Sequence, residues 1–193
     1  MSFLQHLRAQ EDWEIRQWKA FRSHEAQRLL AELPAARTRS ITSLGAASAA
    51  PALEILGKNA GFHVASSSAL PAPLADTVKV AAVDEALRIS LPDVSQDLLL
   101  CLYAMEFLPM DRLYMACSEA KRLLPEGGRW VMLSHHPGRS FYERCRAKLR
   151  GSGFRTLDLN HYVSPEDWDT LREGFFHREG VTSQFLVLQR KSG

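Results

Sequence analysis

The clearest pattern of hydrophobic and polar positions lies between residues 91 and 134. Residues 98–102 are all apolar and too few for an independent helix, which is typical of a parallel strand buried on both faces. From residue 111 to 124, apolar side chains recur every three or four positions, which predicts an amphipathic helix. The charged residues of this helix fall mainly on its other side: Arg112, Glu119, Lys121 and Arg122. A glycine pair ends the helix, and residues 129–133 form a second apolar run with a strand pattern.

A strand, a helix, a glycine turn and a strand make a βαβ unit, and the sheet of such units needs helices on both faces. The predicted fold class is therefore layered α/β. Upstream, the sequence predicts a helix over 11–33, strands over 40–44, 62–65 and 78–83, and a short helix after Pro51. Downstream, it predicts a helix over 141–149, a strand over 154–159, an irregular link with Trp168, Phe175 and Phe176, and a last strand over 184–189.

Composition narrows the class of protein. A length of 193 residues fits one domain. The 24 basic and 22 acidic residues nearly balance, which argues against a general polyanion binder. No stretch approaches the roughly 20 apolar residues of a membrane span, and the charged N-terminal segment lacks the apolar core of a signal peptide. Three widely spaced cysteines fit neither a disulfide framework nor a zinc site, so we expect a cytoplasmic protein with reduced thiols.

Three segments carry a resemblance to a known family: LPDVSQDLLL, AMEFLP and EAKRLLPEGGRWVML. They resemble the second half of the class I S-adenosylmethionine-dependent methyltransferases, of the type 11-like group. The resemblance is good over residues 84–134 and extends by element order from about residue 39 to the C-terminus. It implies a seven-stranded, Rossmann-like sheet that is mostly parallel, with an antiparallel C-terminal hairpin and helices on both faces. The implied organisation is an N-terminal helical extension over 1–38 and a methyltransferase-type domain over 39–193.

The resemblance also implies S-adenosylmethionine as the cofactor. The family places an acidic residue and three glycines after its first strand, and this chain has Ser43 at the acidic place and Gly45 as the one glycine retained. Asp84, a few residues before a Leu-Pro pair, falls at the place that lies near the adenine amino group in the family. The cofactor-binding residues implied in this way are Ser43, Gly45, Ala47, Ser66, Asp84, Glu85 and Tyr103.

Two functions are compatible with these positions. The first is methyl transfer to an unknown acceptor. The second is a non-catalytic binding or assembly module that has lost the cofactor, because the glycine motif is degenerate and Ser66 replaces the carboxylate that would bond both ribose hydroxyls. These changes correspond to a roughly thirtyfold to thousandfold loss of cofactor affinity. A nicotinamide-binding protein is disfavoured, because the first turn lacks the glycines that a pyrophosphate requires.

The candidate catalytic residues lie after the fourth and fifth predicted strands. Methyl transfer requires chiefly that the acceptor nucleophile is aligned with the methyl group, and a side chain of the site can also remove a proton. Tyr103 and Glu106 follow the fourth strand, and His135 and His136 follow the fifth, at the edge where open α/β sheets bind ligands. We take His135, His136 and Tyr103 as the candidates, since an imidazole accepts a proton near neutral pH. The alternative is that both histidines are ordinary loop residues. No metal site is predicted.

A basic segment over 139–155 contains six basic residues and one acid, Glu143. Such a cluster can hold a phosphate-bearing substrate, RNA or a protein partner, because neutralised phosphates release counterions. The alternative is a solvated helix face. The sequence leaves the partner and the methyl acceptor open.

Overall fold

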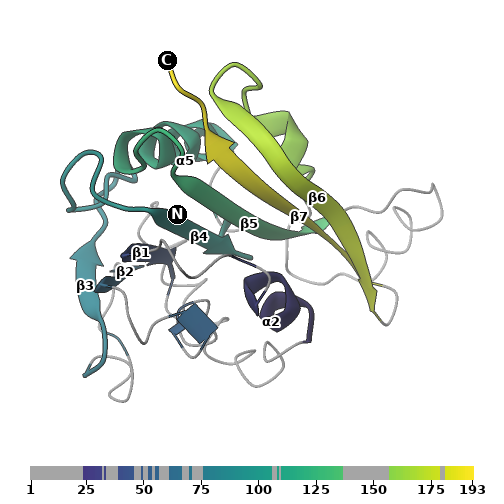
Figure 1. The fold of residues 1–193 in the computed structure, drawn as a ribbon, viewed down its shortest axis with the longest axis horizontal. Helices are drawn as coiled ribbons and strands as arrows, with labels where there is room; N and C mark the ends of the chain where they lie inside the picture. Colours follow the sequence, from purple (N-terminus) through teal and green to yellow (C-terminus); the bar gives the residue numbers. More distant parts are fainter. Residues whose placement is uncertain are drawn as a thin grey trace.

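A sheet of seven strands runs through the computed structural model in the order β3-β2-β1-β4-β5-β7-β6 (Figure 1). The strands are β1 Ser40–Leu44, β2 Gly61–Ser66, β3 Lys79–Ala82, β4 Leu98–Leu102, β5 Arg129–His136, β6 Trp168–Arg178 and β7 Val181–Arg190. The structure describes residues 24–31, 39–45, 61–66, 76–105, 110–136, 157–178 and 181–193, and positions 33, 49, 52, 53, 55, 56, 70 and 108.

The strand directions confirm the predicted fold class. β3, β2, β1, β4 and β5 pair in parallel, whereas β7 pairs antiparallel with both β5 and β6. The chain winds from β1 outward through β2 to β3, then returns to β4 on the other side of β1 and continues to β5. The winding direction therefore reverses between β1 and β4. In open α/β sheets such a reversal marks the crevice in which ligands bind.

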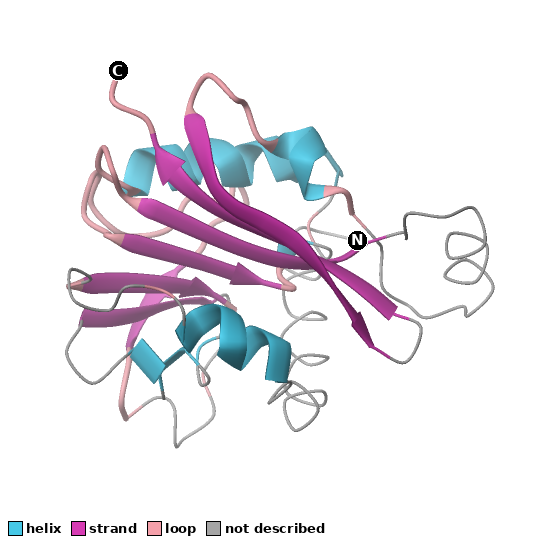
Figure 2. Ribbon diagram, turned by 45° about the vertical axis from the view of Figure 1, so that its right-hand side comes forward, coloured by secondary structure: helices cyan, strands magenta, loops and turns pink. Residues whose placement is uncertain are grey.

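Helices cover both faces of the sheet, as predicted (Figure 2). Helix α5 (Met110–Leu123) packs on one face and helix α2 (His24–Ala31) on the other. Successive strand residues point to opposite faces. We call the side that buries Leu99, Cys101, Trp130 and Met132 the α5 face, and the side that buries Leu98, Leu100, Val131 and Leu133 the α2 face. The side chains of both clusters are almost fully buried, so the two helices are held mainly by apolar burial.

Most predicted elements occur within a few residues of their expected bounds. The predicted strands over 40–44, 62–65, 78–83, 98–102 and 129–133 and the helix over 111–124 are confirmed. Helix α2 is the described part of the helix predicted over 11–33. After Pro51, the described positions 52, 53, 55 and 56 are helical. Residues 11–23 and the helix predicted over 141–149 lie outside the described residues.

The predicted order at the C-terminal end is wrong. Leu157 and Asp158 are not in a strand, and Leu159–Tyr162 is a short 3-10 helix, η4. The Asp158 side chain caps η4 by accepting from the amide of Asn160. The amide of Leu159 donates to the side chain of Gln184 at 2.7 Å, so side chains satisfy this backbone in place of a strand partner. The sixth strand is instead β6, which includes Trp168, Phe175 and Phe176 and had been predicted as an irregular link.

Candidate functional site

The reversal between β1 and β4 brings together Gly45 and Tyr103, the residues that directly follow these strands. Ser43 pairs with Leu100 in the register of β1 and β4, so both strands end at the same edge of the sheet. β2 and β3 end at this edge with Ser66 and Ala82, and β5 ends there with His136. The carboxyl edge therefore collects the ends of all five parallel strands.

Gly45 adopts a left-handed backbone conformation, with a φ of 88°. Its amide donates to the carbonyl of Ala65 on β2 at 3.0 Å, which fixes where the chain leaves β1. A side chain is disfavoured at such a φ, so the turn explains why glycine is retained at this position. Ser43, at the place where the family has an acid, is fully buried, and its hydroxyl donates to the Gly45 carbonyl at 3.5 Å.

The next two strand ends differ in their exposure. Ser66 is buried at the end of β2, whereas Asp84 and Glu85 are exposed after β3. The Asp84 Oδ1 atom accepts from the amides of Ala86 and Arg88, at 2.9 and 2.8 Å. Within the described part of the chain, no interaction engages the other carboxylate oxygen, Oδ2. Asp84 therefore holds its own turn with one oxygen and presents a second acceptor.

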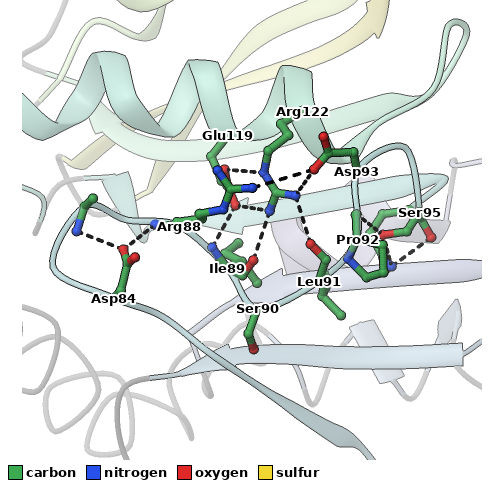
Figure 3. Close-up of polar contacts among 12 residues, drawn as sticks. Asp84, Arg88, Ile89, Ser90, Leu91, Pro92, Asp93, Ser95, Glu119 and Arg122 are labelled. Atoms are coloured by element: carbon green, nitrogen blue, oxygen red, sulfur yellow. Dashed lines mark hydrogen bonds and ion pairs between the residues drawn. The ribbon is translucent and has the colours of Figure 1, made fainter.

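The connection after Asp84 is fixed to α5 by a charged network that the sequence pattern did not reveal (Figure 3). Arg122 donates to the carbonyls of Ile89 and Leu91, each at 2.9 Å, and to the Asp93 carboxylate at 2.5 Å. It also donates twice to Glu119, at 2.5 and 2.8 Å. Glu119 in turn accepts from the amide of Ile89 at 2.7 Å.

Glu119 and Arg122 were predicted on the exposed side of the helix, and this prediction is wrong. Glu119 is 9% exposed, and the Arg122 side chain is 14% exposed. The two charges remain buried because they pair with each other and with the backbone of residues 89–91. The hydrogen bonds that Arg122 donates to Glu119 outweigh the effect of burial and raise the pKa of Arg122 above its ordinary value.

Tyr103 and His135 lie in contact on the α2 face of the sheet. Their ring centroids are 4.6 Å apart. The Tyr103 hydroxyl lies 2.9 Å from that of Ser183 on β7, and Ser183 pairs with His135 in the strand register. Tyr103 is 6% exposed and has a φ of 55°, which is uncommon for a residue with a side chain. The structure therefore joins two of the three predicted catalytic residues in one row across β4, β5 and β7.

His136, the third of these candidates, lies on the α5 face. Its Nε2 atom is 4.0 Å from Asp158 Oδ2, and its ring meets the edge of Phe175 with centroids 5.0 Å apart. Both histidines belong to β5, which is longer than the predicted strand over 129–133, so they are not loop residues. Ala47, Glu106 and the basic segment 139–155 lie outside the described residues.

A separate pocket of about 450 Å³ lies between α5 and residues 161–168. Its lining includes Tyr114, Cys117 and Lys121 of α5 and Tyr162 and Trp168 opposite them. None of the predicted cofactor or catalytic residues contributes to it. Among the described residues, no group of three or more His, Cys, Asp or Glu could hold a metal ion. Within the same residues, no helix is long and apolar enough to cross a membrane.

Solved structures share the architecture described above. The N-methyltransferase NodS from Bradyrhizobium japonicum WM9, in complex with S-adenosyl-l-homocysteine, is 15% identical over 87% of this chain and 87% of its own, with a TM-score of 0.68. A 1,6-didemethyltoxoflavin-N1-methyltransferase from Burkholderia thailandensis, with bound S-adenosylhomocysteine, is 14% identical over 100% and 92%, with a TM-score of 0.66. The chain has the class I methyltransferase fold. No protein-family model and no curated protein sequence matches it.

The class I methyltransferase fold also occurs in a protein described by another activity. The (4+2)-cyclase SpnF is 14% identical over 88% of this chain and 81% of its own, with a TM-score of 0.67. The fold alone therefore does not specify methyl transfer, and the site residues must carry the functional argument.

The described residues of the carboxyl edge fit S-adenosylmethionine in part. Gly45 supplies a turn without a side chain at the reversal of the sheet, and Asp84 supplies an acceptor oxygen at the end of β3. The ends of β1 and β2 carry the buried hydroxyls of Ser43 and Ser66 in place of carboxylates. A glycine turn and an exposed carboxylate oxygen are thus present at this edge, whereas Ser66 provides no bidentate acceptor for a ribose.

Proposed function

We propose that this protein binds S-adenosylmethionine at the carboxyl ends of β1 to β4 and transfers its methyl group to an acceptor. The observation that carries the proposal is the left-handed turn of Gly45 at the reversal between β1 and β4. Without a side chain, the backbone at Gly45 lets a ligand approach closely. The likeness to solved methyltransferases with bound S-adenosylhomocysteine supports the choice of this cofactor.

Asp84 is assigned to the adenine end of the cofactor. Its Oδ1 atom is held by the amides of Ala86 and Arg88, which fixes the direction of the carboxylate. Oδ2 can then accept a hydrogen bond from the exocyclic amino group of adenine. A hydrogen bond to a charged acceptor contributes about 1.5–3 kcal/mol, so one residue can account for at least about tenfold in affinity.

His135 is assigned to the methyl acceptor. The cofactor supplies a methyl group that is already activated by its sulfonium, so the protein chiefly aligns the acceptor and takes up a proton. His135 lies beside Tyr103, and Tyr103 directly follows β4 at the reversal of the sheet. Contact with the tilted Tyr103 ring and the position in β5 hold the imidazole at the carboxyl edge, where it can accept the proton of an acceptor hydroxyl or amine.

A second function, a binding module without catalysis, is favoured by the strand ends. Ser43 and Ser66 are buried, and their neutral hydroxyls do not supply the negative charge that carboxylates would supply at these strand ends. Under this alternative the fold is retained for contact with another molecule, and the carboxyl edge has no role in methyl transfer.

Calorimetric titration separates the two functions. We expect S-adenosylmethionine and S-adenosylhomocysteine to bind with micromolar dissociation constants, and Asp84→Ala to weaken both. The matched control is Asp76→Ala, because Asp76 is also exposed but lies before β3, at the opposite end of that strand. No heat at millimolar ligand would remove the enzyme proposal and leave the binding module. Equal weakening by both variants would show that Asp84 is not at the site.

A further inference from the structure

Arg122 and Glu119 of α5 bond both the carbonyl and the amide groups of one short stretch of backbone, residues 89–91. The guanidinium of Arg122 donates to the carbonyls of Ile89 and Leu91, and Glu119 accepts from the amide of Ile89. Figure 3 shows both side chains reaching from α5 to the connection that lies between Asp84 and Asp93. The polar backbone groups of residue 89 are thus both bonded to α5.

The stretch held by α5 is directly joined to the carboxylate of Asp84. Asp84 Oδ1 accepts from the amide of Arg88, the residue before Ile89, and the Asp84 amide donates to the carbonyl of Arg88 at 3.1 Å. Val83 and Ile89 form an isolated antiparallel bridge, which closes the loop between them. Leu87, inside this loop, has a φ of 61°. A strained conformation of this kind persists only where surrounding contacts fix it.

We propose that Arg122 is a positioning residue for the adenine end of the cofactor, acting through residues 88–91 on the Asp84 carboxylate. The inference rests on the proposed function of Asp84. Arg122 does not touch Asp84, and its contribution is to keep the turn at residues 84–88 in the one arrangement that presents Oδ2. Glu119 assists by orienting the guanidinium and by holding the Ile89 amide.

The geometry requires an arginine at position 122. Four different acceptors surround the guanidinium: the carbonyls of Ile89 and Leu91 and the carboxylates of Asp93 and Glu119. A planar fork with five N–H groups can meet them together, whereas a lysine ammonium has three donors on one atom. Arg122→Lys therefore keeps the charge opposite Glu119 but loses the simultaneous hold on both carbonyls.

The test compares Arg122→Lys and Arg122→Gln with Lys121→Gln. Lys121 is the preceding residue of α5 and pairs with Asp167 on the other side of the helix, so its replacement removes the same charge without touching residues 88–91. Thermal unfolding shows which variants are folded. If Arg122→Gln is not folded, Arg122→Lys alone is used for the test. Two quantities are then measured: the solvent-exchange rates of the Ala86 and Arg88 amides without ligand, and the affinity ratio of S-adenosylhomocysteine to S-inosylhomocysteine.

We expect both Arg122 variants to speed exchange at Ala86 and Arg88 by about tenfold or more, and Lys121→Gln to leave it unchanged. S-inosylhomocysteine lacks the adenine amino group, so the affinity ratio measures how strongly the protein recognises that group. The Asp84→Asn variant gives the reference ratio for a protein without the Asp84 carboxylate. The Arg122 variants should reduce the ratio to that of Asp84→Asn, about tenfold below wild type, whereas loss of stability alone would not change it.

The proposal is overturned if folded Arg122 variants keep wild-type exchange rates at both amides. It is also overturned if exchange rises while the affinity ratio stays at the wild-type value, because Arg122 would then act on the loop without acting on recognition. If wild-type protein binds neither ligand, the proposed function fails, and the exchange rates still decide whether Arg122 holds the Asp84 turn.

Discussion

His135 and His136 are neighbours in the sequence, yet their side chains lie on opposite faces of the sheet. His135 contacts Tyr103 on the α2 face, with the two rings tilted by 49°, whereas His136 lies near Asp158 on the α5 face. The separation follows from the alternation of side chains along β5, which continues through both residues. A pair of histidines acting together on one substrate is therefore incompatible with the fold.

The two imidazoles should respond differently to the cofactor. Titration with S-adenosylhomocysteine is expected to shift the ring resonances of His135 more than those of His136, because His135 contacts the residue that follows β4 at the reversal of the sheet. Two-dimensional NMR of the imidazole groups measures this, with His135→Gln and His136→Gln providing the assignments. Larger shifts at His136 would place the ligand on the α5 face and contradict the assigned role of His135.

The hydroxyls of Tyr103 and Ser183 should be coupled energetically. Both residues are buried and their hydroxyls are 2.9 Å apart, so removing either one leaves the other without this partner. Tyr103→Phe and Ser183→Ala should each lower the free energy of unfolding by about 1–3 kcal/mol, and the double variant by less than their sum. Urea unfolding of the four proteins gives the coupling. Strict additivity would show that the contact contributes nothing.

The sequence predicted the elements whose patterns are set by local rules. β4 is a short apolar run and β5 contains one, and α5 has a regular apolar stripe with a proline and a glycine pair at its end. β6 was missed because it is an edge strand with few apolar residues, and an irregularity between Thr170 and Arg172 interrupts its alternation. The run over 154–159 looks like a strand, but Asp158 and Gln184 cap η4 instead.

The position of candidate site residues was predictable where the order of the strands determines it. Gly45 was singled out by the resemblance to the family's glycine motif, and Tyr103 by its place directly after β4. Glu119 and Arg122 could not be predicted in this way, because helical periodicity treats charged residues as exposed, and their partners at residues 89–93 are about 30 positions away in the sequence. Such a network depends on tertiary packing, which leaves no local pattern.

His63 should make the protein less stable in mild acid. The pKa of His63 lies below its ordinary value of 6.5, mainly because the imidazole is partly buried and secondly because the charge of Lys79 is near. A hydrogen bond with Gln96 acts in the opposite direction but is the smaller effect. The native state therefore resists protonation, while the unfolded chain takes up a proton as the pH falls through about 6.5. The stability contributed by neutral His63 is full above this pH and is lost progressively below it.

Urea unfolding at about pH 7.5 and about pH 5.5 tests this pH dependence. His63→Gln should lose less stability than wild type between the two pH values, because the titrating group is gone. Lys79→Gln should also lose less, since the repelling charge is removed. An unchanged pH dependence in both variants would exclude His63 as the source.

Cys117 should be a poorly reactive thiol in the folded protein. Burial raises its pKa to about 12, and Sγ donates to the carbonyl of Tyr162 at 2.9 Å. Because the thiolate is the nucleophile, alkylation by iodoacetamide near pH 8 should be at least about a hundredfold slower than in urea-unfolded protein. Mass spectrometry of the peptide that contains Cys117 gives both rates. Equal rates would contradict the partly buried, hydrogen-bonded thiol.

The most direct test of the central claim is the affinity for S-adenosylhomocysteine of Gly45→Ala compared with Gly127→Ala. Gly127 also has a left-handed backbone, with a φ of 77°, but it lies in the turn before β5, at the amino edge of the sheet. Because both glycines have a left-handed φ, both replacements impose a similar backbone strain of about 1–2 kcal/mol. At Gly127 the new Cβ would add no clash, since its nearest contact is Gln189 at an ordinary 3.8 Å. If the cofactor binds at the reversal between β1 and β4, Gly45→Ala should weaken binding about tenfold or more and Gly127→Ala should leave it unchanged. Equal affinities of the two variants would contradict a cofactor site at Gly45.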